Sequence, residues 1–227
     1  MNGADNLYIH KSASLSPYLE DYEDHGRLSP STLDAQLSEP WSFSFDVSSA
    51  EAVSTISVSS CEDYFRASGA EPVQPFEYPV YNSLGKRCLA AKWIANMTSA
   101  EESYIGEITV DEGLVASLPK EFSFIVSTSE WQRIMEDREI KTWSDVYEIK
   151  HIETTSPYEL TVDLAAARQE LVLLARGDMN DDGIEDVLFK VLSYSLEGTY
   201  SAMHLFVVTR RSSDSSFELA RHTKADS

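Results

Sequence analysis

Apolar and polar residues alternate strictly along short stretches of the C-terminal half of the chain. In residues 158–164, Tyr, Leu, Val and Leu occupy every second position, with Glu, Thr and Asp between them. Side chains of a β-strand point alternately to opposite faces, so this period of two predicts a half-buried strand. Further strands are expected at residues 171–175, 187–192, 204–208 and 217–221. Together these stretches predict an antiparallel sheet in the C-terminal half.

Helical spacing appears mainly upstream of these strands. In residues 83–97, Leu84, Cys88 and Ala91 recur at intervals of three and four, which places them on one face of a helix. Shorter helices are expected at residues 33–37, 61–67 and 129–138. A Ser-x-x-Glu sequence with the spacing of a capping box precedes the last of them.

Helices that precede strands, rather than alternate with them, favour an α+β fold. We therefore expect helices mostly in the N-terminal half and an antiparallel sheet in the C-terminal half, with an Asp-rich loop between two of its strands. Additional strands are expected at residues 41–47, 104–110 and 121–126. By composition the chain divides into an irregular acidic arm at 1–38, a mixed α/β region at 39–142 and an antiparallel β region at 143–227. The last two regions can also form one continuous domain.

The chain is strongly acidic, with 38 Asp and Glu against 18 Lys and Arg and a net charge of −20. Both halves of the chain carry the excess of acid. A field of this sign repels nucleic acid and anionic membranes and attracts basic proteins. We therefore expect a basic protein partner, and neither nucleic acid nor a membrane. The alternative is that the acidity serves only solubility.

The chain has no run of about 18 apolar residues, which a membrane-spanning helix needs. Its first residues also lack the apolar core of a signal peptide, so we expect a cytoplasmic protein. A periplasmic location is the alternative if a signal peptide has been removed. Cys61 and Cys88 fit free buried thiols in the cytoplasm, or a single disulfide if the protein is exported.

An acidic loop at residues 178–186 has a spacing with chemical meaning. Asp178, Asn180 and Asp182 place side-chain oxygens at alternate positions, Gly183 follows, and Asp186 adds a further carboxylate. Ca²⁺ takes six or more oxygen ligands, and a loop with this spacing can wrap several around one ion. Repulsion between the carboxylates also favours a bound cation. A metal-free hairpin turn is the alternative, because Asn, Asp and Gly are common turn residues.

The loop departs from an EF-hand, since Glu185 and Phe189 stand where that motif has an apolar residue and a bidentate Glu. It more closely resembles the Asp-x-Asn-x-Asp-Gly-x-x-Asp calcium loops of FG-GAP, integrin-type repeats, which join two β-strands. The resemblance covers one copy over about 20 residues. It implies a Ca²⁺ ion held by the side chains of Asp178, Asn180, Asp182 and Asp186 and by the backbone carbonyl of Ile184.

Patterns typical of catalysis are missing from the sequence. The five histidines form no zinc-ligand pattern with Cys or with one another. There is no Gly-x-Ser-x-Gly elbow, phosphate loop or dinucleotide fingerprint. We therefore expect a protein that is not an enzyme.

In overall character the chain is similar to immunity proteins encoded beside secreted bacterial effectors, including type VI effectors. The similarity lies in its acidity and compact α+β pattern. It implies a non-enzymatic inhibitor that binds and neutralises a cognate toxin, such as a basic nuclease. The expected contact residues are acids and aromatic anchors of the N-terminal arm: Tyr18, Glu20, Asp21, Tyr22, Glu23 and Asp24. A disordered acidic arm is the alternative interpretation of these residues.

Two other functions stay open. One is an exported calcium-binding structural module of the bacterial envelope, in which the loop stabilises the sheet. The other is a hydrolase that uses the metal of the acidic loop. Calcium-dependent melting separates the first of these from the inhibitor.

Overall fold

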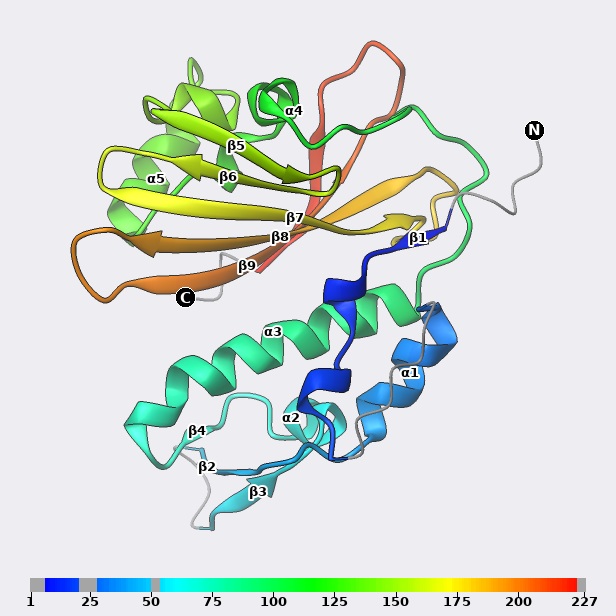
Figure 1. Ribbon diagram of the computed structural model, residues 1–227, viewed down its shortest axis with the longest axis vertical. Helices are drawn as coiled ribbons and strands as arrows, with labels where there is room; N and C mark the ends of the chain where they lie inside the picture. The colour runs from blue at the N-terminus through cyan, green and yellow to red at the C-terminus, as the bar shows by residue number, and fades with distance from the viewer. Residues whose placement is uncertain (1–6, 21–27, 50–53, 224–227) are drawn as a thin grey trace. The chain divides into compact units, whose positions relative to one another are not determined.

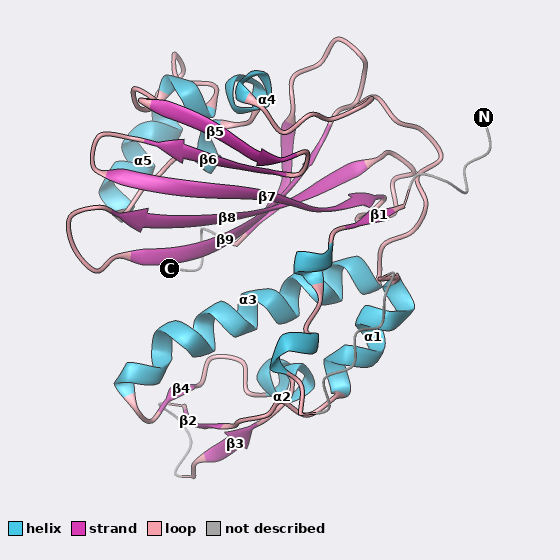
Figure 2. Cartoon of the chain, in the orientation of Figure 1, coloured by secondary structure: helices cyan, strands magenta, loops and turns pink. Residues whose placement is uncertain are grey.

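The computed structural model describes residues 7–20, 28–49 and 54–223 and divides into two compact units (Figure 1). One, here called the sheet unit, combines Met1–His10 with Thr98–Ser227. The other, here called the helical unit, is Lys11–Met97. The predicted α+β fold is confirmed: the helices lie mostly in the N-terminal part, and a large antiparallel sheet fills the C-terminal half (Figure 2).

The sheet unit is built on one antiparallel sheet with the order β10-β9-β8-β7-β6-β5. Its strands are β5 (His151–Ser156), β6 (Glu159–Asp163), β7 (Ala167–Gly177), β8 (Asp186–Ser195), β9 (Ser201–Thr209) and β10 (Glu218–His222). Neighbours in the chain are therefore neighbours in the sheet, as hairpin connections allow. Every C-terminal strand expected from the alternating pattern is confirmed.

A short strand near the start of the chain completes this sheet. β1 (Tyr8–Ile9) pairs with Arg176 and Ala175 of β7. β6 pairs with a different stretch of β7, from Arg168 to Val172. Because the other edge of β7 is paired with β8, β1 and β6 share one edge and lie in line along it.

Short helical elements cover one face of the sheet. They are α4 (Glu112–Ser117), η4 (Lys120–Phe122), α5 (Thr128–Glu136) and η5 (Trp143–Asp145). The ring of Phe122 stacks on Phe206 of β9 at 4.2 Å between centroids and meets Phe189 of β8 edge-on at 5.9 Å. These rings lie at the centre of the apolar core of the unit. The expected helix start is confirmed, because Ser127 Oγ accepts a hydrogen bond from the Glu130 N–H at 3.2 Å.

Gln169 connects this helical layer to the sheet. Its side chain is fully buried on β7. Its Oε1 accepts a hydrogen bond from Trp143 Nε1 at 3.1 Å, and its Nε2 donates to the Phe122 carbonyl and to Ser193 Oγ, both at 3.0 Å. One amide thus satisfies groups from η4, η5 and β8, which a buried polar group requires.

The helical unit contains three α-helices and a small antiparallel sheet within its described residues. The helices are α1 (Pro30–Ser38), α2 (Cys61–Arg66) and α3 (Tyr78–Ala95), and the shorter turns are η1 (Lys11–Ala13), η2 (Ser16–Tyr18) and η3 (Pro75–Glu77). The sheet has the order β3-β2-β4, from β2 (Phe45–Ser48), β3 (Ile56–Val58) and β4 (Glu71–Pro72). No helix among the described residues is long and apolar enough to cross a membrane.

A disulfide between Cys61 and Cys88 joins α2 to α3, with a Cα–Cα distance of 5.4 Å. Of the two alternatives for these cysteines, the structure shows the disulfide and not free thiols. The two helices approach closely beside it. A Cβ on Gly85 would lie 2.0 Å from the Tyr64 ring, so only glycine fits at this position of α3.

The described start of the chain is ordered by buried contacts, and the expectation of an irregular arm at 1–38 is corrected there. Gln36 of α1 is fully buried, accepts a hydrogen bond from the Leu15 N–H at 2.9 Å and donates to Ser16 Oγ at 2.8 Å. The expected boundary near residue 142 also differs from the observed units. Phe122 and Trp143 pack into the core of the sheet, so the chain from Thr98 onward belongs with it.

Two expected strands, at residues 104–110 and 121–126, do not form. In the first, Gly106 has a φ of 68°, which turns the chain out of an extended path. In the second, Phe122 enters the core from a 3₁₀ turn, and its carbonyl bonds Gln169 instead of a neighbouring strand. The longest helix begins at Tyr78, before the expected start at residue 83, because Pro79 occupies its first turn, where no N–H is needed.

The amide of Gln169 should be essential to the stability of the sheet unit. We expect Gln169→Ala to lower the free energy of unfolding by roughly 2–5 kcal/mol, because it strands the buried Trp143 N–H and the Phe122 carbonyl. Urea denaturation measures this change. The matched control is Gln132→Ala on the exposed face of α5, which should change stability by less than about 0.5 kcal/mol. Equal stabilities of the two variants would contradict the assigned role.

Candidate functional site

The acidic loop joins β7 to β8, between two strands as expected. Asp178 organises its first half: Oδ1 accepts hydrogen bonds from the N–H groups of Asn180 at 3.1 Å and Asp181 at 2.8 Å. Its Oδ2 accepts from the Gly183 N–H at 2.8 Å. Gly183 has a φ of 79°, which favours glycine. One carboxylate therefore holds the loop in a closed turn.

The other predicted ligands also bind backbone groups of the loop. Asn180 Oδ1 accepts from the Asp182 N–H at 3.0 Å, and Asp182 Oδ1 accepts from the Ile184 N–H at 2.9 Å. Asp186 Oδ2 accepts from the Met179 N–H at 3.0 Å. The structure thus brings the predicted residues together in one loop, although each carboxylate is directed partly at the backbone.

Asp186 is the most deeply buried carboxylate of the loop and is fully inaccessible to solvent. Among the described residues, no group donates a hydrogen bond to its Oδ1. The Thr209 hydroxyl lies beside Asp186 and donates to the Glu185 carbonyl at 3.3 Å. Burial, together with the charges of Asp182 and Asp178, raises the pKa of Asp186 to about 6. A cation would satisfy the open oxygen and restore the charged form.

The chemistry of the donors therefore fits a hard cation such as Ca²⁺, which prefers carboxylate and carbonyl oxygens. As the described side chains stand, however, no three His, Cys, Asp or Glu groups converge closely enough to hold a metal ion. Ile184, whose carbonyl is the fifth predicted ligand, forms a parallel bridge with Glu102. Calcium binding by these five residues stays a prediction.

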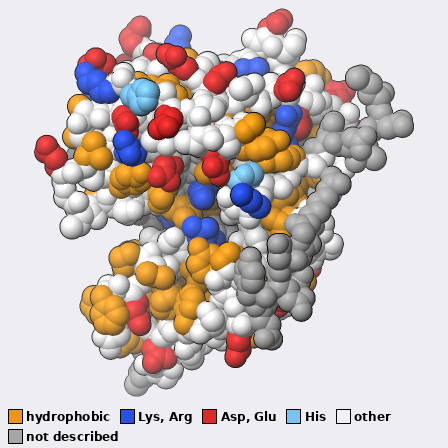
Figure 3. Space-filling model, in the orientation of Figure 1, with side chains coloured by type: hydrophobic (Ala, Val, Ile, Leu, Met, Phe, Trp, Pro, Cys, Tyr) orange, Lys and Arg blue, Asp and Glu red, His pale blue; other side chains and the backbone are white. Residues whose placement is uncertain are grey.

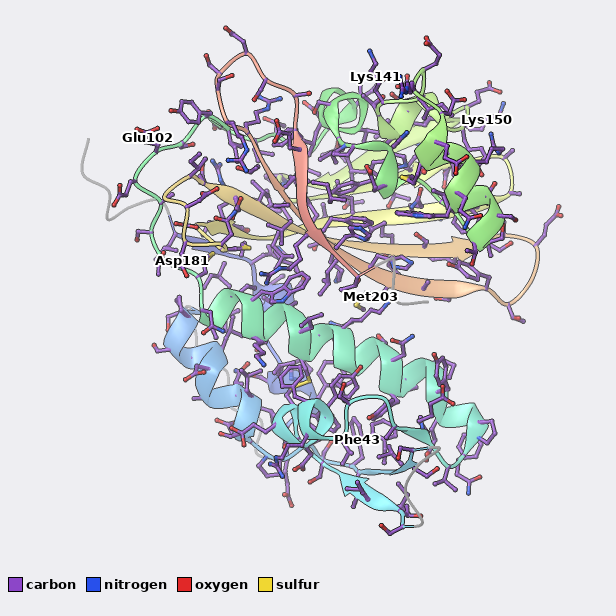
Figure 4. The ribbon with its side chains drawn as sticks, turned by 180° about the vertical axis from the view of Figure 1, so that it is seen from behind. Phe43, Glu102, Lys141, Lys150, Asp181 and Met203 are labelled. Atoms are coloured by element: carbon purple, nitrogen blue, oxygen red, sulfur yellow. A yellow bond between two sulfur atoms is a disulfide. The ribbon has the colours of Figure 1, made fainter. Side chains whose placement is uncertain are left out.

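A second segment, residues 98–106, supports the loop from outside and was not anticipated. Glu101 and Glu102 both donate backbone N–H groups to the Gly183 carbonyl, at 2.8 and 3.0 Å. Figure 4 shows Glu102 and the loop residue Asp181 at the same end of the sheet unit. In the sequence, the only feature that these two segments share is their excess of acidic residues. Sequence spacing carries no information about such a distant pairing.

A buried ion pair strengthens the base of the loop. Arg176 Nε and an Nη of the same guanidinium donate to the two carboxylate oxygens of Glu185, at 2.9 and 2.8 Å. Glu185 is almost fully buried, and Arg176 also donates to the Gly106 carbonyl at 2.7 Å. Glu185, which breaks the EF-hand pattern, therefore fixes the hairpin and the supporting segment together.

The structure describes only two of the predicted partner-binding residues of the N-terminal arm, Tyr18 and Glu20. Asp21, Tyr22, Glu23 and Asp24 lie outside the described residues. Glu20 is exposed, as a contact residue should be. The ring of Tyr18 is covered in part by the guanidinium of Arg87, at 5.3 Å from its centroid, and is half-buried. Contact of these residues with a partner stays a prediction.

The helical unit has an exposed apolar surface that the sequence analysis missed. We define the apolar ridge as Val73, Phe76, Tyr78 and Val80, whose exposed fractions are 45%, 76%, 47% and 55%. Figure 3 shows apolar side chains gathered over β4 and the beginning of α3. Pro72, Pro75 and Pro79 in this stretch are typical of a loop. The sequence feature that could have indicated this surface is the set of aromatic and branched residues that lie between those prolines.

A hollow of about 430 Å³ lies in the sheet unit between α5 and the β6–β7 turn. Its lining is largely apolar and includes Phe124 and Leu164. Tyr147 forms part of its wall, and its phenol O–H donates a hydrogen bond to a carboxylate oxygen of Glu130. Burial, and to a smaller extent this hydrogen bond, raise the pKa of Tyr147 to about 12. The hollow suits an uncharged apolar group.

The raised pKa of Asp186 predicts a pH effect on metal-free protein. Because the folded pKa of about 6 exceeds the usual 3.8, the folded state binds the proton more tightly between these values. The contribution of Asp186 to stability therefore falls as pH rises from about 4 to 6, by roughly 1–3 kcal/mol, and stays lower above 6. Asp186→Asn should remove this fall.

Urea denaturation in EDTA at several pH values measures the free energy of unfolding of the wild type and of Asp186→Asn. The difference between the two at each pH isolates the effect of Asp186 from that of the other carboxylates. Asp181→Asn is the control, because Asn accepts the positive φ of 61° at that position. It should keep the pH dependence of the wild type. Parallel curves for wild type and Asp186→Asn would show that Asp186 ionises normally.

Comparison with known proteins yields no match for this chain. No protein-family model matches it. No curated protein and no solved structure matches it either.

Proposed function

We propose that this chain is a non-enzymatic inhibitor, an immunity protein that neutralises a cognate bacterial toxin by direct binding. The observation that carries the proposal is the surplus of exposed acid. Ion pairs among the described residues engage only a minority of the 38 acidic side chains. The remainder gives both units a negative surface that suits a basic partner.

Each unit carries this charge independently. The helical unit contains 12 Asp and Glu against 6 Lys and Arg, and the sheet unit contains 26 against 12. Several exposed carboxylates of the sheet unit lie on its helical layer and adjoining strand, including Glu112, Glu136, Glu139, Glu148 and Glu153. A field spread over a whole surface steers diffusion of a basic protein and raises its association rate.

Acidic surfaces suit inhibitors of basic nucleases for a further reason. Carboxylates present negative charge in place of the phosphate groups that the nuclease binds. The acidity and the α+β character of the chain are also what we expect of an immunity protein of a secreted effector. Binding alone would then block the toxin, without any chemical step on this chain.

Co-expression with the product of the neighbouring gene tests this proposal. We expect one equivalent of this chain to abolish the activity of a basic toxin, with an association rate that falls roughly tenfold or more between low and high salt. Glu136→Gln/Glu139→Gln/Glu153→Gln should slow association without changing the melting temperature, because these side chains are exposed. Full toxin activity in the presence of excess wild-type chain would refute the proposal.

A second function is favoured by two separate observations. The Cys61–Cys88 disulfide is typical of proteins outside the cytoplasm, which supports the periplasmic alternative. The open oxygen of buried Asp186 supports a cation in the loop. These features suit an exported calcium-binding structural module of the envelope, in which Asp178, Asn180, Asp182, Asp186 and the Ile184 carbonyl hold the ion.

Thermal melting in calcium and in EDTA tests this second function. Millimolar Ca²⁺ should stabilise the wild type by about 1–3 kcal/mol if the dissociation constant lies ten- to a hundredfold below the calcium concentration. Asp186→Asn should lose this gain, and Asp181→Asn should retain it. Identical melting of the wild type in calcium and EDTA would remove the calcium module and leave the inhibitor proposal intact.

A further inference from the structure

We infer that the apolar ridge of the helical unit is the surface on which a basic protein partner docks, with Phe76 as the central anchor. The inference deepens the proposed inhibitor function and rests on it for the identity of the partner. It places the contact on the segment from β4 to the first turn of α3. The N-terminal arm is then not the principal contact.

The four side chains of the ridge are too concentrated to be ordinary surface scatter. Single exposed apolar residues are common on soluble proteins. Here four of them lie within eight consecutive residues, and Phe76 is 76% exposed. Exposed apolar side chains concentrated in one short segment indicate an interaction site, because leaving them in water forgoes the free energy of burial.

The ridge is held rigidly by its neighbours in the helical unit. Pro72 pairs with Val47 of β2, and the Val73 N–H donates to the Asp46 carbonyl at 2.8 Å. Immediately after the ridge, the ring of Tyr81 packs edge-on against Phe45 at 5.3 Å. Three prolines in the segment fix their own φ angles. A surface ordered in advance loses little entropy when it binds.

The charges around the ridge select the partner. Glu71, Glu77 and the exposed Asp46 adjoin it, whereas the chain has no Lys or Arg between Ala67 and Gly85. An apolar centre with an acidic rim complements an apolar or aromatic patch with a basic rim. A second copy of this chain would bring acid against acid, and an anionic membrane would be repelled.

Two matched double variants of the full-length chain test the inference. Phe76→Ala/Tyr78→Ala removes the aromatic side chains of the ridge. Val126→Ala/Leu196→Ala removes two apolar side chains of similar exposure, 50% and 55%, from the sheet unit. Thermal melting first verifies that both variants fold like the wild type. Calorimetry then measures binding to the purified toxin from the neighbouring gene.

We expect the ridge variant to bind that toxin roughly 100-fold more weakly, since aromatic anchors dominate binding energy, and the control to bind like the wild type. Glu71→Gln/Glu77→Gln should slow association while leaving dissociation nearly unchanged. Tight binding by wild type and ridge variant alike would overturn the docking surface and leave the inhibitor function standing. A wild type that does not bind the toxin would overturn both.

Two further results would replace the basic protein with another occupant and overturn the inference. In sedimentation, a wild-type dimer that the ridge variant cannot form would assign the surface to a second copy. Wild-type binding to phosphatidylcholine vesicles, lost in the ridge variant, would assign it to a lipid surface. A monomer that ignores vesicles and binds the toxin through Phe76 and Tyr78 supports the inference.

Discussion

The sheet unit depends on a single buried amide. Gln169 lies near the beginning of β7, and its three hydrogen bonds reach η4, η5 and β8. Because a buried amide must satisfy both its donor and its acceptor, the helical layer can settle on the sheet in only one register. The stacked Phe122 and Phe206 rings supply apolar burial in the same place, but they do not specify position as hydrogen bonds do. In this core, the aromatic rings therefore supply apolar burial, and the hydrogen bonds of Gln169 specify the position of the helical layer.

The acidic loop and the apolar ridge place the two unusual features of the chain on different units. In the loop, carboxylates lie close to one another because backbone N–H groups and the Arg176 guanidinium donate hydrogen bonds to them. On the ridge, apolar side chains are exposed beside further acids. We propose that a bound ion accounts for the arrangement of the loop and a protein partner for that of the ridge.

The sequence predicted the parts of the fold that rest on local pattern. The strict alternation in β6 and the cap at Ser127 express backbone geometry within a few residues, and both were found where expected. The strand expected at 121–126 failed because Phe122 serves a distant partner, Gln169, across 47 residues. The sequence also placed Asp178 to Asp186 in one loop between two strands, but it could not predict the support of this loop by Glu101 and Glu102. Nonlocal contacts leave no periodic trace in a sequence.

The pairing of β1 with β7 makes the sheet unit discontinuous along the chain. His10 donates its N–H to the Leu174 carbonyl of β7, and Thr98 exchanges hydrogen bonds at 2.9 Å with Asp178, the residue after β7. Both segments of the sheet unit that flank residues 11–97 in the chain are therefore paired within the sheet unit. Tyr8 and Arg176 are separated by 168 positions. At typical rates of translation β1 leaves the ribosome about 10–30 s before its partner exists. The first strand to be made therefore waits for its partner until the whole inserted unit has been synthesised, and that unit can form its disulfide while the sheet is still incomplete.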